Sequence, residues 1–141
     1  MTVHALDTQM FVALKAFIKK DGKVLVLKDH GTKGLDFPGG KYRTGKKYKD
    51  ELHREVNEET DLQIKIGKPF HVWTDKYHHT NLDKNDVFVI CFFCEYVSGE
   101  VKLSEEHDDF EWVDIKSAEK WKEDTGFWKA LEEYFRVMKF V

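Results

Sequence analysis

The stretch from Gly39 to Asp61 constrains this chain most, because its second half places carboxylates at a spacing that suits only a helix. At about 3.6 residues per turn, Glu55, Glu58 and Glu59 fall within an arc of roughly 100°. Glu51 projects into the same arc one turn earlier. Like charges three or four residues apart destabilise an isolated helix by a few tenths of a kcal/mol per pair. A stable fold therefore needs positive charge opposite these acids.

Two sources of positive charge are expected at this helix. Arg54 lies within the acidic run and supplies one of them. A hard divalent cation, Mg²⁺ or Mn²⁺, binds oxygen ligands and supplies the other. Leu52 and Val56, one turn apart, give the helix an apolar edge that can pack on a sheet. The alternative is that the acids form only a solvated helix face.

The spacing of these residues resembles the Nudix box, the signature G-x5-E-x7-R-E-U-x-E-E-x-G-U of the Nudix (MutT-like) hydrolases, in which U is aliphatic. Gly40 takes the first position of the box without any gap in the match. The later positions are filled by Arg54, Glu55, Val56, Glu58, Glu59 and Leu62. Two positions depart from the signature, because Lys46 stands at its first Glu and Asp61 at its second Gly.

The resemblance implies roles for individual residues. Metal-binding carboxylates carry over onto Glu55, Glu58 and Glu59, and the orienting arginine carries over onto Arg54, whereas the Lys46 position carries over nothing. The segment SEEHDDFEWVDI resembles the part of the family that supplies a further carboxylate, for which Glu106 is the closer match and Glu105 the alternative. The family fold is α+β, an α/β/α sandwich with a mixed sheet between helices.

Length and charge restrict the possible classes of protein. The 141 residues, of 16.7 kDa, suit a single domain spanning residues 1–141. The net charge of −3 argues against general binding of nucleic acid or of an anionic membrane, since both need a basic surface. The sequence has no run of 18 apolar residues and no signal-peptide pattern over Met1–Met10, so a cytoplasmic location is expected.

Cys91 and Cys94 form a CxxC pattern within VFVICFFCEYV. The run is rich in β-branched and aromatic residues and predicts a strand, in which positions three apart point to opposite faces. A zinc site would also need a second pair of ligands at suitable spacing. Buried structural thiols are therefore predicted rather than a redox or metal site.

Strands and turns are predicted on both sides of the acidic helix. Lys20-Asp21-Gly22-Lys23 predicts a hairpin between strands within Met10–Lys19 and Val24–Leu27. After the helix, short strands are expected at Gln63–Ile66 and Phe70–Trp73, and a long central strand at Asp86–Tyr96.

The C-terminal part of the chain is predicted to end in an amphipathic helix capped by Asp124 or Thr125. Its apolar stripe is expected in the core and consists of Phe127, Trp128, Leu131, Tyr134, Phe135 and Met138. Before it, Phe110, Trp112 and Ile115 are also expected to face the core.

Four residues are candidates for contact with a substrate. Gly39 and Gly40 let the backbone approach a ligand closely or take a positive φ. Trp73 and Tyr77 flank a polar loop and can stack on a base, although a core residue and a solvated residue are the simpler interpretations. The neighbouring pair His78-His79 is too weak a pattern to predict a metal site.

Two hypotheses of function follow. The first is a metal-dependent hydrolase that cleaves a phosphoanhydride bond in a nucleotide, acting as a monomer or homodimer. The short segment before the first strand favours a compact ligand, so a nucleoside triphosphate is expected ahead of ADP-ribose, another nucleotide sugar or a dinucleoside polyphosphate. The second is a Nudix-like module that binds a nucleotide without hydrolysing it, which Lys46 keeps open.

Overall fold

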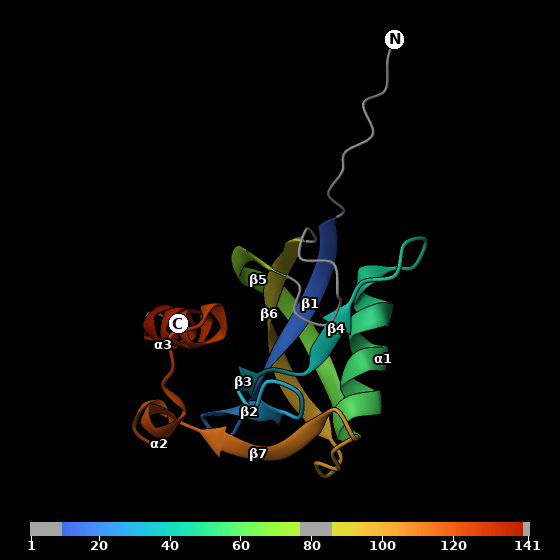
Figure 1. Cartoon of the computed structure of the whole chain (residues 1–141). Helices are drawn as coiled ribbons and strands as arrows, with labels where there is room; N and C mark the ends of the chain where they lie inside the picture. The colour runs from blue at the N-terminus through green and yellow to red at the C-terminus, as the bar shows by residue number, and fades with distance from the viewer. Residues whose placement is uncertain (1–9, 77–85, 140–141) are drawn as a thin grey trace.

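The computed structural model describes residues 10–76 and 86–139. A mixed sheet lies between helix α1 on one side and helices α2 and α3 on the other, which confirms the predicted α+β sandwich (Figure 1). The strands are β1 Met10–Lys20, β2 Lys23–Asp29, β3 Leu35–Asp36, β4 Gly39–Lys41, β5 Gln63–Lys76, β6 Asp86–Ser98 and β7 His107–Val113. The helices are α1 Tyr48–Thr60, α2 Ile115–Ala118, a short 3₁₀ turn Glu119–Trp121, and α3 Gly126–Met138.

The sheet forks along β1. Its main order is β3-β2-β1-β6-β5, with β1 and β6 parallel and the other pairs antiparallel. At the hairpin, β1 pairs with β2 through Lys19 and Lys20, whereas further back Ala13–Lys15 pairs with β4 instead. Because β2 diverges from β1, it carries β3 and β7 away from the rest of the sheet.

The predicted hairpin is confirmed between β1 and β2. Asp21 and Gly22 form its two-residue turn with φ values of 52° and 77°. Two positive φ values in sequence match the right-handed twist of the flanking strands, and Asp and Gly tolerate them. The hairpin therefore forms from local sequence alone.

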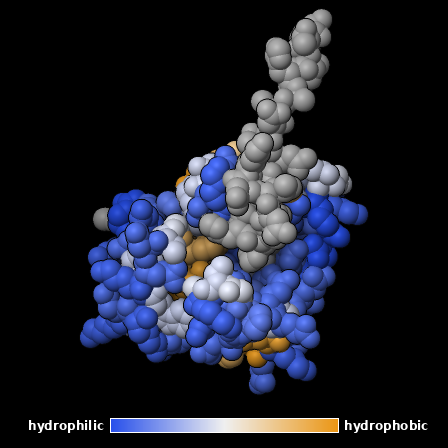
Figure 2. Space-filling view, in the orientation of Figure 1, coloured by the Kyte–Doolittle hydropathy of each residue, from blue (hydrophilic) through white to orange (hydrophobic). Residues whose placement is uncertain are grey.

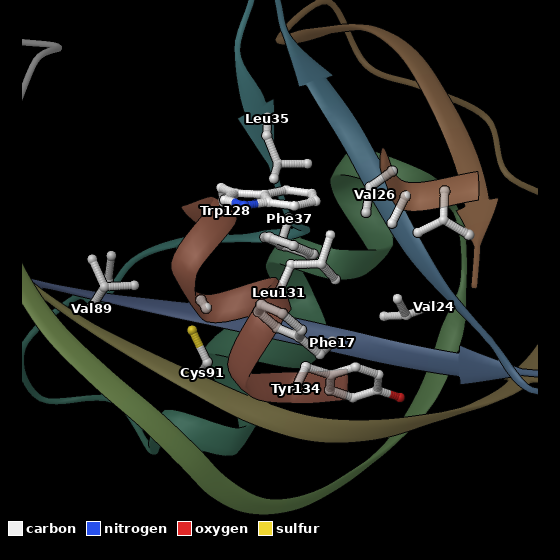
Figure 3. Close-up of a cluster of buried hydrophobic side chains, with 14 of the residues drawn as sticks. Phe17, Val24, Val26, Leu35, Phe37, Val89, Cys91, Trp128, Leu131 and Tyr134 are labelled. Carbon is white, nitrogen blue, oxygen red and sulfur yellow. The ribbon is translucent and has the colours of Figure 1, made fainter. Parts of the chain in front are cut away.

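Alternation along β1 divides the core into two layers. Phe17 points toward α3 and stacks on Phe37 with the ring centroids 3.8 Å apart, whereas Leu14 and Ile18 point toward α1. Figure 3 shows the α3 layer, in which Trp128, Leu131 and Tyr134 lie against the sheet. The α1 layer includes Leu52, Val56, Leu62, Ile64, Phe92 and Cys94.

Both cysteines are buried free thiols, as predicted. Cys91 belongs to the α3 layer and Cys94 to the α1 layer, so the two side chains lie on opposite faces of β6. Burial raises the pKa of the Cys94 thiol to about 12 and raises that of Cys91 as well. The long strand predicted around them is also confirmed, and it lies inside the sheet between β1 and β5.

The prediction of two short strands after α1 was wrong, because residues 63–76 form one strand, β5. Its pairing with β6 is interrupted between Ile66 and Pro69 and again between Pro69 and His71. Proline has no N–H to donate and is tolerated in a sheet at bulges and edges, and β5 is an edge strand of the main order. The Gly67–Pro69 segment bends the strand without ending it.

Two predicted core residues in the C-terminal part lie outside the core. Phe110 is 38% exposed and Ile115 is 54% exposed, whereas Val113 and Ala118 are buried. Phe110 shares a face of β7 with Trp112, but only Trp112 packs against the α1 layer. Ile115 is the first residue of α2, where one turn of helix covers little of the sheet.

The C-terminal helix is confirmed. Thr125 caps α3 by accepting a hydrogen bond from the Trp128 N–H at 3.3 Å, and the predicted apolar stripe packs on the sheet. None of the described helices has both the length and the apolar composition needed to cross a membrane. The face in Figure 2 is mainly hydrophilic, with hydrophobic residues gathered in a central hollow and near one edge.

We predict that α3 needs a glycine at position 126 to pack against Trp73. A Cβ atom there would lie 2.2 Å from the Trp73 indole nitrogen and 2.6 Å from another ring atom. Gly126→Ala should lower the free energy of unfolding by about 1–3 kcal/mol, despite the better helix propensity of alanine. Gly31→Ala is the control, because its Cβ would meet only the flexible Asp29 carboxylate at 3.3 Å. Equal stability of the two variants in urea titrations would contradict the prediction.

Candidate active site

Helix α1 contains the acidic run, as predicted. It ends next to one of the two positions at which this sequence differs from the Nudix signature. Asp61, at the position of the second box glycine, adopts a left-handed conformation with φ 63° and donates its N–H to the Asn57 carbonyl at 2.8 Å. Aspartate is one of the few residues that tolerate this conformation. The departure at Asp61 therefore preserves the C-terminal cap of the helix.

Arg54 lies among the acids of α1 and joins three of them. Its guanidinium donates to Glu55 at 2.7 Å, to Glu58 at 2.9 Å and to Glu51 at 3.2 Å. Arg54 thus supplies the positive charge expected on this face of the helix. The contacts also hold the carboxylates of Glu55 and Glu58 toward one another.

Glu51 has a different environment from the other acids. It is buried, and Arg43 donates two hydrogen bonds to its carboxylate at 2.7 and 2.8 Å. Hydrogen bonds from Arg43 and Arg54 lower the pKa of Glu51 to about 2. Lys46 does not take part in these contacts, since it is exposed and makes no ion pair with the described residues.

Glu59 is buried at the C-terminal end of α1, 4% exposed, and accepts a hydrogen bond from the Gly39 N–H at 3.1 Å. Gly39 has φ 139°, and a Cβ atom there would lie 1.9 Å from the Leu14 carbonyl oxygen. A Cβ atom on Gly40 would lie 2.9 Å from the Glu55 carboxylate. The paired glycines thus let the backbone pass between β1 and the acids, and their contact with a substrate stays a prediction.

A buried ionic network lies in the fork of the sheet beside Glu59. The Lys15 ammonium is 3.0 Å from Asp36 and donates to the Phe37 carbonyl at 3.3 Å. His107 Nε2 lies 2.9 Å from the other carboxylate oxygen of Asp36. Burial alone would raise the pKa of Asp36, but Lys15 and His107 lower it to about 2. Asp36 is therefore ionised at neutral pH.

The described residues contain two groups of three possible metal ligands. In one, ligand atoms of Glu59, Glu106 and His107 all lie within 4.8 Å of one another. The other consists of Asp29, Asp36 and His107. The structure thus brings Glu106 beside Glu59, whereas the carboxylates of Glu55 and Glu58 are bound by Arg54.

Sequence reasoning missed Lys15, Asp36 and His107. A signal was present, because Lys15 interrupts the apolar run VALKAF and Asp36 stands between the apolar Leu35 and Phe37. A charged residue within a buried strand needs a partner. The partners come from β1, β3 and β7, so the sequence alone did not reveal the pairing.

The electrostatics of this site favour a cation. Burial raises the pKa of Glu59 to about 9, and the charges of Asp36 and Glu106 add to this against the opposing charge of Lys15. A divalent cation would offset that repulsion and keep Glu59 ionised. The oxygen-rich ligand set therefore fits a divalent metal.

Trp73 lies on β5 and is not bonded to the buried network among the described residues. Its ring meets Phe127 edge-on with the centroids 5.2 Å apart, and its Nε1 atom has no hydrogen-bond partner among the described residues. It borders a shallow groove of about 350 Å³ that His71, Trp73, Thr74, Asp75, Gly126 and Lys129 line. Contact between Trp73 and a base stays a prediction, and Tyr77, His78 and His79 lie outside the described residues.

Comparison with known proteins agrees with this geometry. The model of the NUDIX domain matches residues 11–134. The nucleoside triphosphatase NudI of Escherichia coli is 31% identical over 108 residues, which cover 68% of this chain and 76% of NudI. An ADP-ribose pyrophosphatase of Methanocaldococcus jannaschii is 27% identical over 128 residues, covering 89% of this chain and 73% of that protein.

Solved structures give the same result. The MutT protein of Methanosarcina mazei Go1 superposes with a TM-score of 0.77 at 25% identity, covering 96% of this chain and 99% of that one. The chain therefore belongs to the Nudix family of pyrophosphohydrolases.

The raised pKa of Glu59 predicts how stability varies with pH in the absence of divalent cations. Between about pH 5 and 9, the folded state retains a proton on Glu59 that the unfolded state has lost. Stability should therefore fall as the pH rises, by at most about 1.4 kcal/mol per pH unit. Urea titrations in EDTA measure this slope. Glu59→Gln should remove it, and equal slopes in the two proteins would refute the assignment.

Glu51 and Lys46 are predicted to differ in their effect on turnover. Glu51→Gln weakens the contacts that hold Arg54 and leaves Glu55 and Glu58 less well placed, so kcat should fall about tenfold or more. Lys46→Glu alters an exposed residue without an ion pair among the described residues and should change kcat less than about threefold. A large gain of activity in Lys46→Glu would favour the module that only binds nucleotides.

Proposed function

We propose that this enzyme hydrolyses nucleoside triphosphates to the monophosphate and pyrophosphate in a reaction that depends on Mg²⁺ or Mn²⁺. The observation that carries the proposal is the convergence of Glu59 and Glu106 beside the end of the box helix. Glu59 is buried there without a side-chain cation bonded to it among the described residues. A site of this kind suits a metal–phosphate complex more than a free anion.

The residues of the box helix have separate roles in the proposal. Glu55, Glu58 and Glu59 hold the cation, which neutralises the phosphates and stabilises charge that develops on oxygen. Arg54 keeps Glu55 and Glu58 in place through its hydrogen bonds at 2.7 and 2.9 Å. This ordering restricts the carboxylates to a narrow set of positions before the substrate arrives.

Glu106 is proposed to accept the proton of the attacking water. It is exposed at the start of β7, within reach of solvent, and a ligand atom of Glu59 lies within 4.8 Å of it. The water oxygen forms a bond to phosphorus while the phosphoanhydride P–O bond breaks, and pyrophosphate leaves with the electron pair of that bond.

The segment from the end of β4 to the first turn of α1 supports a triphosphate. Residues 41–49 carry five cationic side chains and no acidic ones, which is unusual in a chain of net charge −3. These cations are Lys41, Arg43, Lys46, Lys47 and Lys49. Because the segment continues from Gly40, which touches Glu55, its positive field acts near the phosphates. The similarity to the nucleoside triphosphatase NudI points the same way.

ADP-ribose is the second candidate substrate. The relative named ADP-ribose pyrophosphatase aligns over 89% of this chain, a longer share than NudI. Other nucleotide sugars and dinucleoside polyphosphates share the same phosphoanhydride chemistry. We further propose that the enzyme acts on small nucleotides in the cytoplasm, as a monomer or homodimer, with a base resting against Trp73 and Tyr77.

Product analysis tests this proposal. Purified enzyme is incubated with nucleoside triphosphates, ADP-ribose and dinucleoside polyphosphates, each with Mg²⁺, Mn²⁺ or EDTA. Chromatography should show monophosphate and pyrophosphate from triphosphates as the fastest reaction, and none in EDTA. Glu58→Gln should reduce kcat by about a hundredfold or more and keep its fold, because Glu58 is exposed. Faster release of AMP and ribose phosphate from ADP-ribose would replace the triphosphate assignment.

A further inference from the structure

One ring nitrogen of His107 has a hydrogen-bond partner, and the other has none among the described residues. The residue is 6% exposed, and its Nε2 atom lies 2.9 Å from Asp36. Its Nδ1 atom is buried and has no hydrogen-bond partner among the described residues. Buried polar atoms are nearly always paired, so an unpaired nitrogen in this position requires a physical explanation.

Asp36 determines which nitrogen of His107 carries the proton. The Lys15 ammonium lies 3.0 Å from Asp36 and keeps it ionised, so the Asp36 carboxylate can only accept hydrogen bonds. The 2.9 Å contact therefore requires a proton on Nε2 of His107. In neutral imidazole the other nitrogen, Nδ1, then carries a lone pair.

No described donor is bonded to the Nδ1 atom of His107, and two carboxyl groups lie beside the ring. A ring nitrogen of His107 and carboxylate oxygens of Glu59 and Glu106 lie within 4.8 Å of one another. A doubly protonated ring would donate a hydrogen bond to one of these carboxylates, and the described residues contain no such bond. Carboxylate oxygens and a nitrogen lone pair are ligand atoms that a divalent cation accepts.

We propose that His107 supplies a nitrogen ligand, through Nδ1, to the divalent cation that Glu59 binds beside Glu106. The inference rests on the proposed function, because it assigns a further ligand to the same metal. Asp36 then orients the ring through its contact with Nε2, on the side away from the metal. This is the carboxylate–histidine–metal arrangement, which raises the basicity of the ligand. Lys15 is the positioning residue for Asp36.

The alternative group of Asp29, Asp36 and His107 fits a cation less well. Asp36 in that group already receives hydrogen bonds from Lys15 and His107, and Asp29 accepts one from the Thr32 N–H at 2.8 Å. A cation there would compete with those donors. Asp29 therefore offers a matched control for the proposed ligands.

A nitrogen ligand also changes which metal the site prefers. Mg²⁺ binds oxygen ligands almost exclusively, whereas Mn²⁺ accepts imidazole as well. Wild-type enzyme should therefore bind Mn²⁺ at least about tenfold more tightly than Mg²⁺, and loss of Nδ1 should narrow this ratio. Titration calorimetry with each metal salt alone measures both affinities without any substrate.

The direct test is electron spin echo envelope modulation of bound Mn²⁺. Enzyme labelled with ¹⁵N only in histidine is compared with unlabelled enzyme, and a change in the nitrogen modulation is expected. His107→Gln keeps a side-chain donor for Asp36 and removes Nδ1, so the modulation should vanish and the Mn²⁺ affinity should fall at least about tenfold. The same substitution at the half-buried His71 of β5 is the control and should change neither quantity.

The outcomes separate this inference from the proposed function. Bound Mn²⁺ without histidine modulation in the wild type would overturn the nitrogen ligand and leave metal-dependent hydrolysis intact. Modulation that persists in His107→Gln would also overturn it, as would a loss of Mn²⁺ affinity in Asp29→Asn but not in Glu59→Gln. A wild-type enzyme that binds no divalent cation would overturn both proposals. Since the labelled wild type is tested directly, a poorly folded variant does not decide the result.

Discussion

The fold depends on the burial of four ionisable side chains where the sheet forks, namely Lys15, Asp36, His107 and Glu59. Moving a charge out of water costs several kcal/mol unless the charge is paired and hydrogen-bonded. Lys15, Asp36 and His107 come from β1, β3 and β7 and pair with one another, and Glu59 of α1 accepts from the Gly39 N–H, so these contacts form only when all these elements are in place. Apolar packing alone would tolerate small shifts between these elements. The ionic contacts near 3 Å do not tolerate such shifts, because the contacts would be lost. The network therefore fixes the position of the proposed metal ligands together with the fold.

The glycine pair before the box connects this network to the helix that carries the acids. Gly39 has no side chain, so its backbone passes within contact distance of Leu14, and its N–H reaches the Glu59 carboxylate. The Ala16 N–H donates to the Pro38 carbonyl at 2.7 Å, which continues the pairing of β1 along the lead-in. The glycines are thus explained by close packing of the backbone, independently of any ligand. A substrate that contacts them would meet a surface already held in position.

The parts of the structure that depend on local sequence were predicted well. The box helix, the hairpin at Asp21-Gly22 and the C-terminal helix each follow from periodicity, turn chemistry or capping within a few residues. The errors arose where distant contacts decide. Two short strands were predicted at Gln63–Ile66 and Phe70–Trp73, whereas the pairing of β5 with β6 continues past Pro69 through a bulge. Ile115 was predicted in the core, but it is 54% exposed on the first turn of α2. Likewise the fold brings Lys15 beside Asp36, and the sequence spacing of the two residues does not reveal that contact.

The two departures from the box have separate physical explanations. Asp61 replaces a glycine at a left-handed position, and its side chain tolerates that conformation, so the end of α1 is unchanged. Lys46 stands where the box has a carboxylate. Glu51 instead supplies a carboxylate that contacts Arg54, and Arg43 donates two hydrogen bonds to it. Arg54 therefore retains a buried anion as well as its contacts with the two acids further along the helix. Lys46 was the one feature that favoured a module without catalytic activity. Since the carboxylate lost at that position has a counterpart within the same helix face, Lys46 gives no physical reason to expect a loss of turnover.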